Sequence, residues 1–123
     1  MAWELEEGPA SRGTVIELDA SSFDAAVAQG VVLVDFFATW CSHCATQAPI
    51  LDDVARQVQG KALVAKLDVD QARSVAQAYG VSAIPTLIVF KDGHVFTRFL
   101  GVTQASVLVA AIESATEHQV PVR

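Results

Sequence analysis

Two cysteines, the only ones in the 123-residue chain, lie three positions apart in the segment Trp40-Cys41-Ser42-His43-Cys44. Sulfurs at this spacing can close into a disulfide within one helical turn, and they can also supply two ligands to a metal ion. Two cysteines placed at random would show this spacing in roughly one chain in sixty, so the pair is informative but not decisive. The candidate chemistry is therefore reversible thiol–disulfide exchange or metal binding.

The residues on either side place the pair between a strand and a helix. Residues 31–37 are almost all apolar, which is typical of a strand buried on both faces of an α/β sheet. Residues 41–58 predict a helix that ends before Gly60, with a kink rather than a stop at Pro49. Free N–H groups and the positive dipole end of that helix would stabilise a thiolate at Cys41, whereas Cys44 would be more buried.

The remaining segments predict a single α/β domain. Strands are expected at 14–18, 31–37, 62–68, 86–90 and 94–100, and helices at 23–29, 41–58, 71–79 and 103–116. Asp92-Gly93 between the last two strands is a strong hairpin signal. The order βαβαβαββα predicts a central mixed sheet with helices on both faces. Residues 1–13 are interpreted as a flexible leader and 117–123 as a frayed tail, which leaves the domain at 14–116.

Composition excludes several classes of protein. The hydrophobic fraction is 52%, against 18% charged residues and a net charge of -6. This balance is incompatible with intrinsic disorder, and the acidic charge argues against a nucleic-acid partner. Two cysteines cannot build a disulfide-stapled secreted scaffold, and no apolar run approaches the ~20 residues that span a membrane. The acidic residues 1–9 lack the pattern of a secretory signal, so a cytoplasmic location is expected.

Segments typical of one known family occur in order along the chain. They are Val34-Asp35-Phe36, Ala38-Thr39-Trp40-Cys41, Pro49, Val64-Ala65-Lys66-Leu67-Asp68, Tyr79-Gly80-Val81, Ile84-Pro85-Thr86, Asp92-Gly93 and Gly101. On these segments the chain resembles the thioredoxin family from about residue 14 to 115. The resemblance implies the thioredoxin fold, thiol–disulfide exchange as the activity, and no prosthetic group.

The resemblance also implies a role for each residue of the reactive centre. Cys41 resembles the attacking nucleophile and Cys44 the resolving thiol. Asp35 resembles the buried carboxylate that assists proton transfer to and from Cys44, and Lys66 resembles its cationic neighbour. Burial among apolar side chains would raise the pKa of Asp35 towards neutrality, where a carboxylate serves as a base. The alternative for Asp35 is a surface position at a strand edge.

A substrate platform is implied around the reactive sulfur. Pro85 resembles the cis-proline of the family, which lies against the cysteine pair. Backbone groups beside it, notably those of Ile84, would pair with an extended substrate segment. Trp40, Gly101 and Val102 would complete this apolar platform, and the alternative for Trp40, compatible with that role, is packing in the core.

The motif itself departs from that of typical thioredoxins. They read Cys-Gly-Pro-Cys followed by lysine, whereas this chain reads Cys41-Ser42-His43-Cys44 followed by Ala45. Histidine at this position resembles protein disulfide isomerases and periplasmic disulfide oxidants. Its imidazole can donate a hydrogen bond or supply positive charge to Cys41, which stabilises the reduced pair and predicts a potential of about -240 to -160 mV. Alternatively, His43 points into solvent and tunes nothing.

Three function classes remain open. The first is a monomeric thiol–disulfide oxidoreductase that acts on protein disulfides and dithiols, takes electrons from a reductase or glutathione, and binds neither nucleic acid nor membrane. Because Ala45 replaces the lysine, a standard thioredoxin reductase is expected to serve it poorly. The second class is a binding or chaperone-like module with a secondary redox role. The third is a metal site, which would need a dimer to complete four zinc ligands.

Overall fold

A computed structural model describes residues 13–118. Its elements are β1 (Val15–Leu18), α2 (Phe23–Val27), β2 (Val31–Phe37), α3 (Ser42–Gln57), β3 (Leu63–Asp68), α4 (Arg73–Ala78), β4 (Thr86–Lys91), β5 (His94–Leu100) and α5 (Ala105–Glu117). The predicted element order βαβαβαββα of an α/β fold is confirmed. Nearly all of the proposed leader and most of the proposed tail lie outside the described residues.

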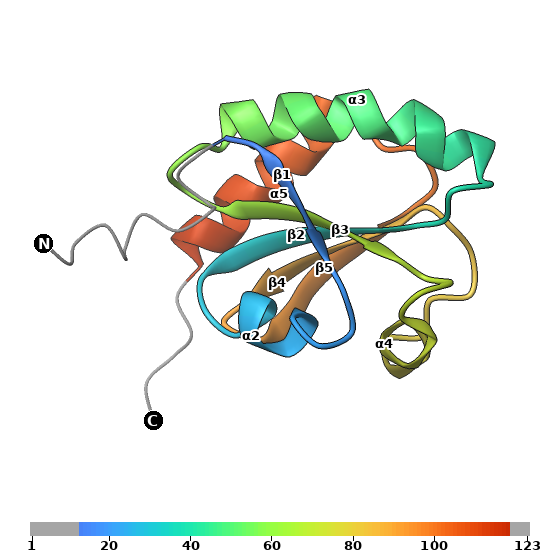
Figure 1. Ribbon diagram of the computed structural model, residues 1–123. Helices are drawn as coiled ribbons and strands as arrows, with labels where there is room; N and C mark the ends of the chain where they lie inside the picture. The colour runs from blue at the N-terminus through green and yellow to red at the C-terminus, as the bar shows by residue number, and fades with distance from the viewer. Residues whose placement is uncertain (1–12, 119–123) are drawn as a thin grey trace, which may run out of the picture.

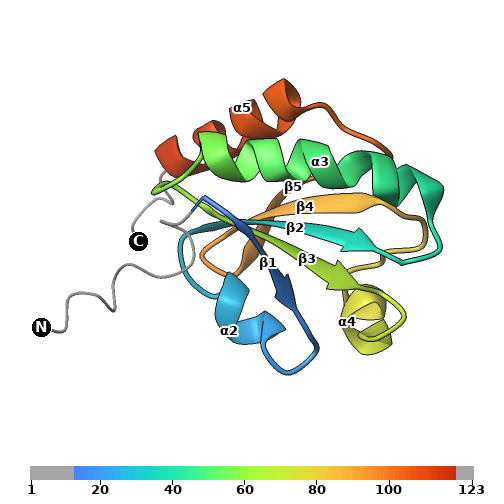
Figure 2. The same ribbon diagram turned by 45° about the horizontal axis from the view of Figure 1, so that its top comes forward.

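The sheet has five strands in the order β1-β3-β2-β4-β5, with β2 at its centre. Strands β1, β3 and β2 run parallel, whereas β4 and β5 are antiparallel to their neighbours. Helices α3 and α5 cover one face of the sheet, and α2 and α4 cover the other (Figures 1 and 2). The reactive segment between β2 and α3 therefore leaves the sheet at the end of its central strand.

Two hydrophobic core clusters lie on the two faces of the sheet. Side chains of β2 alternate between them: Val32, Val34 and Phe36 belong to the cluster that includes residues of α2 and α4. Val31 and Leu33 belong to the cluster beneath α3 and α5. By the same alternation, Asp35 faces the helix that carries Cys44.

The predicted hairpin joins β4 to β5. Asp92 and Gly93 both have positive φ angles, of 50° and 84°, as a type I′ turn requires. Asp92 also ties the turn to the segment before β2, because its Oδ1 accepts a hydrogen bond from Gly30 N at 2.8 Å. Asp92 N donates to Gly30 O at 2.9 Å. These contacts hold the antiparallel half of the sheet in register with the central strand.

Helix α3 starts one residue after Cys41 and continues through Pro49 to Gln57, close to the predicted span. Nowhere between residues 13 and 118 does a helix have the length and apolar character needed to cross a membrane.

Candidate active site

Cys41 and Cys44 are joined as a disulfide, with their Cα atoms 5.2 Å apart. Cys41 is the N-cap of α3, and its Sγ accepts a hydrogen bond from Cys44 N at 3.2 Å. Cys41 is half-buried, whereas Cys44 is buried. The predicted difference in accessibility is confirmed, and it leaves Cys41 as the sulfur that a substrate can reach.

Part of the predicted platform lies near this sulfur. The Ile84–Pro85 peptide bond is cis, and the carbonyl oxygen of Ile84 lies 3.9 Å from Cys41 Sγ. Gly101 N donates a hydrogen bond to Pro85 O at 2.8 Å, which joins the loop after β5 to the segment before β4. Val102, the next residue of that loop, is half-buried. The segment before β4 thus lies beside Cys41, and the loop after β5 is bonded to that segment.

Trp40 belongs to the surface and not to the core. Its side chain is 71% exposed, which rules out the core alternative. The indole Nε1 donates a hydrogen bond to Asp70 Oδ2 at 2.7 Å. Asp70 N in turn donates to Asp68 Oδ1 at 2.9 Å, at the end of β3. This polar anchor lets a large apolar ring remain exposed beside Cys41 in a fixed position.

Asp35 is buried in the sheet, with only 2% of its surface exposed. Its Oδ1 has no hydrogen-bond partner among residues 13–118. Burial raises the pKa of Asp35 from its ordinary 3.8 to about 7, against the opposing effect of the positive charge of Lys66. The surface alternative for Asp35 is therefore wrong, and its carboxyl group can gain or lose a proton near neutral pH.

Lys66 lies opposite Asp35 on the neighbouring strand β3. The two residues form no ion pair within 4.0 Å, and Lys66 Nζ instead lies 5.3 Å from the ring centroid of Phe37. A lysine ammonium over an aromatic face is attracted by the ring quadrupole. Phe37 therefore helps to set the distance between the lysine charge and Asp35, a role that sequence reasoning missed.

A pocket of about 320 Å³ connects these groups beneath α3. It is lined by both cysteines, Asp35, Lys66 and Asp52, among others. Asp52 was also missed from the sequence. It lies eight residues after Cys44, so the two share a face of α3, and that spacing could have identified it. The pocket gives the buried carboxyl group of Asp35 a route to water.

Gln47 links the reactive helix to the platform loop. Its side chain is fully buried, and its Nε2 donates to Thr103 O at 2.9 Å while its Oε1 accepts from Thr103 N at 2.8 Å. Thr103 Oγ1 donates to Gly101 O at 2.9 Å. Sequence reasoning did not single out Gln47. A polar residue four positions before Leu51, on the apolar face of the helix, was the available signal.

His43 lies exposed in the first turn of α3. It makes no hydrogen bond or ion pair with any other residue that the structure describes, so its predicted effect on Cys41 stays a prediction. Within residues 13–118, no group of three or more His, Cys, Asp and Glu side chains could hold a metal ion.

Comparison with known proteins agrees with this geometry. The family model described as thioredoxin matches residues 14–114. Thioredoxins from Staphylococcus aureus strains Mu50 and MW2 are each 47% identical over 87 residues, which cover 71% of this chain and 84% of theirs. Among solved structures, a mutant thioredoxin from Halobacterium salinarum NRC-1 superposes with a TM-score of 0.81 and 37% identity. That match covers 93% of this chain and 100% of the other.

Proposed function

Because this chain belongs to the thioredoxin family, whose members are thiol–disulfide oxidoreductases, we propose that Cys41 and Cys44 exchange a disulfide with protein substrates. One observation carries the assignment of Cys41 as the nucleophile: its sulfur is the accessible one, at a helix N-terminus and 3.9 Å from Ile84 O. The neighbouring Ile84–Pro85 segment offers backbone groups to an extended substrate.

In the reducing direction, the Cys41 thiolate attacks one sulfur of a substrate disulfide. A Cys41–substrate mixed disulfide forms, and the second substrate sulfur leaves and takes a proton. Asp35 then accepts the proton of Cys44, directly or through water in the pocket. The Cys44 thiolate attacks Cys41 Sγ, which closes the Cys41–Cys44 disulfide and releases the first substrate sulfur as a thiolate that takes a proton from Asp35 or water. Two electrons pass to the substrate, and Lys66 offsets part of the negative charge on Asp35.

The same proposal includes the electron source, the cellular location and the oligomeric state. A reductase or glutathione returns the pair to the dithiol state. Because Ala45 stands where typical thioredoxins have lysine, we expect slow NADPH-linked reduction by a standard thioredoxin reductase, and fast reduction would reject this point. The protein is proposed to act as a cytoplasmic monomer, which cell fractionation and gel filtration test.

Substitution of the two cysteines tests the assignment. Cys41→Ser should abolish dithiol-dependent reduction of insulin, whereas Cys44→Ser should trap a mixed disulfide between Cys41 and the substrate. Reduction of insulin by the Cys41→Ser variant would overturn the proposal.

His43 is proposed to make the pair more oxidising than that of a typical thioredoxin. Positive charge beside Cys41 stabilises the reduced form, and the expected potential lies between about -240 and -160 mV, against about -270 mV for thioredoxin. Redox titration against glutathione measures it, with His43→Ala as the matched variant and a more negative potential expected. Equal potentials for the two proteins would show that His43 tunes nothing.

A further inference from the structure

A second pocket, of about 200 Å³, adjoins the platform on the side of the sheet away from α3. It is lined by Gly80, Ser82, Ala83, Thr86, Arg98 and Leu100. These residues come from the segment between α4 and β4, from the start of β4 and from the end of β5. None of them has a part in the exchange reaction described above.

The pocket is continuous with the platform along the chain. Ala83 and Thr86 flank the Ile84–Pro85 segment, and Leu100 precedes Gly101, whose N–H bonds to Pro85 O. Thr86 Oγ1 donates a hydrogen bond to Ala83 O at 2.6 Å, which fixes the segment between the platform and the pocket. A substrate that extends along Ile84 therefore passes next to this pocket.

Arg98 supplies a positioned positive charge at the pocket. Its Nη2 donates to Tyr79 O at 2.7 Å, which holds the guanidinium against the segment after α4. A guanidinium has five N–H donors, so others are left for a ligand. Arg98 forms no ion pair with any carboxylate among residues 13–118. The charge is therefore in place before a ligand arrives, and less conformational entropy is lost on binding.

The remaining walls are suited to a short side chain that ends in a carboxylate. Ser82 is exposed, and its hydroxyl has no protein partner within the described part of the chain. Leu100 is 72% exposed and provides an apolar wall for methylene groups. Among the described residues that line the pocket, Arg98 alone is charged, so none of them repels an anion.

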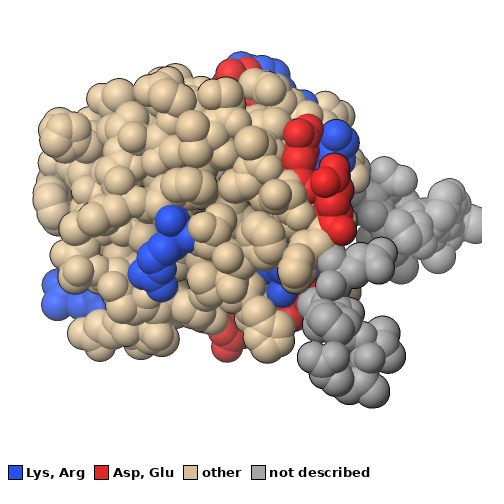
Figure 3. Space-filling model, turned by 180° about the vertical axis from the view of Figure 1, so that it is seen from behind, with Lys and Arg blue, Asp and Glu red and all other residues tan. Residues whose placement is uncertain are grey.

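The face of the molecule that carries β5 is largely uncharged (Figure 3). Strand β1 lies in front in Figure 1, so the opposite edge strand β5 lies on the far side, which Figure 3 shows. Uncharged side chains cover most of that side, and several separate Lys or Arg side chains lie on it (Figure 3). Arg98 places a positive charge beside the platform on a protein with a net charge of -6.

We propose that this pocket binds the carboxylate of an aspartate or glutamate that lies near the reactive cysteine of an extended protein substrate. The inference rests on the proposed function, since it assigns a preferred substrate class to the same site. An exposed ion pair contributes little free energy, so the expected preference is about twofold to fivefold in kcat/KM.

The test uses disulfide-linked peptide dimers that differ at one residue. In each series, Glu, Gln or Lys occupies one of the three positions on either side of the cysteine. Each peptide is assayed with the wild-type protein, Arg98→Gln, Arg98→Lys and the control Arg73→Gln, which changes an exposed arginine of α4 outside the pocket. At one position at least, the Glu peptide should exceed the Gln peptide about twofold to fivefold, and the Lys peptide should fall below both.

The variants distinguish binding of the carboxylate in the pocket from a general effect of positive charge on the protein. Arg98→Gln should remove the preference for Glu, Arg98→Lys should retain part of it, Arg73→Gln should retain all of it, and added salt should reduce it. Equal rates for Glu and Gln peptides at every position, or equal losses in Arg98→Gln and Arg73→Gln, would overturn the inference. Failure of the proposed function gives a different result, because no peptide would then be reduced through Cys41.

Discussion

At the scale of single residues, the proton chemistry of the site depends on how Asp35 is separated from Lys66. The carboxyl group is buried with one oxygen unpaired among the described residues, while the ammonium lies over Phe37. Desolvation therefore outweighs the attraction between the two charges, and the pKa of Asp35 rises to about 7. A close ion pair would instead have kept Asp35 ionised and unable to take up a proton at neutral pH.

The raised pKa of Asp35 predicts that stability falls as pH rises. Between pH 3.8 and about 7, the native protein binds a proton at Asp35 that the unfolded chain does not. The free energy of unfolding therefore decreases across this window, by up to about 4 kcal/mol. Asp35→Asn removes the ionisable carboxyl group, and with it the loss of stability that ionisation of a buried group causes. The oxidised variant should therefore be about 2–4 kcal/mol more stable than wild type at pH 8 and similar to it near pH 4.

Urea unfolding of the oxidised proteins at both pH values measures the difference. Asp53→Asn serves as the control, since Asp53 is on the outer side of α3 and should change stability by less than about 0.5 kcal/mol at either pH. A gain for Asp35→Asn that is the same at pH 4 and pH 8 would contradict ionisation of Asp35 as the cause.

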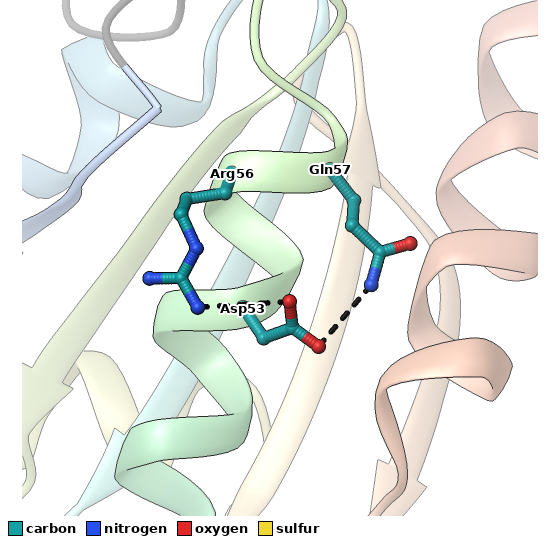
Figure 4. Close-up of polar contacts among 3 residues, drawn as sticks. All are labelled: Asp53, Arg56 and Gln57. Carbon is teal, nitrogen blue, oxygen red and sulfur yellow. Dashed lines mark hydrogen bonds and ion pairs between the residues drawn. The ribbon is translucent and has the colours of Figure 1, made fainter.

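At the scale of elements, α3 has two kinds of polar contact at its two ends. Near its start, buried Gln47 bonds twice to the backbone of Thr103. Near its end, Gln57 Nε2 donates to Asp53 Oδ2 at 3.2 Å, and Arg56 lies 3.6 Å from the same carboxylate on the exposed side of the helix (Figure 4). The contacts of Gln47 join α3 to the loop after β5, whereas those of Asp53 stay within the helix.

This difference predicts unequal effects of two matched substitutions. Gln47→Met keeps the side-chain volume but leaves the N–H and C=O of Thr103 without their partner, which should cost about 1–3 kcal/mol in urea unfolding. Gln57→Met removes an exposed contact and should cost less than about 0.5 kcal/mol. Amide hydrogen exchange at Thr103 should accelerate only in Gln47→Met. Equal costs for the two variants would mean that the Gln47 contacts do not hold the platform loop.

Element types could be predicted from the sequence, whereas their ends depended on local hydrogen bonds. The strands at 31–37 and 94–100 occupy the predicted residues because continuous apolar runs and the Asp92-Gly93 turn define them. The strand expected from residue 62 starts at Leu63, because Ala62 N bonds to Val58 O in the turn after α3. Strand β4 extends to Lys91, which pairs with Val31 across the sheet.

The site was predictable only where a local motif or the family resemblance marked it. Cys41, Cys44 and Asp35 were identified because each lies in a short segment typical of the family. Gln47 and Thr103 are 56 positions apart, and no sequence pattern joins them before the helix packs on the loop. The pocket around Arg98 likewise requires β5 to meet the segment after α4.

At the scale of the whole molecule, the core that the structure describes extends over nearly all of residues 13–118. All members of the two core clusters fall between Val15 and Ala115. Both edge strands of the sheet, β1 and β5, are also inside this range. The domain boundaries proposed from the sequence, 14–116, stay a prediction, because the two clusters describe only residues 13–118.

A chain cut to residues 13–118 should consequently unfold like the full chain. We expect its free energy of unfolding in urea, followed by circular dichroism, to differ by less than about 1 kcal/mol, because every core residue that the structure describes is retained. A second variant that starts at Ser22 also removes β1, whose four residues pair with β3 and whose Leu18 is buried. That variant should lose cooperative unfolding, since β3 becomes an exposed edge and Asp35 loses part of its cover. Comparable losses in both truncations would place part of the stabilising core outside residues 13–118.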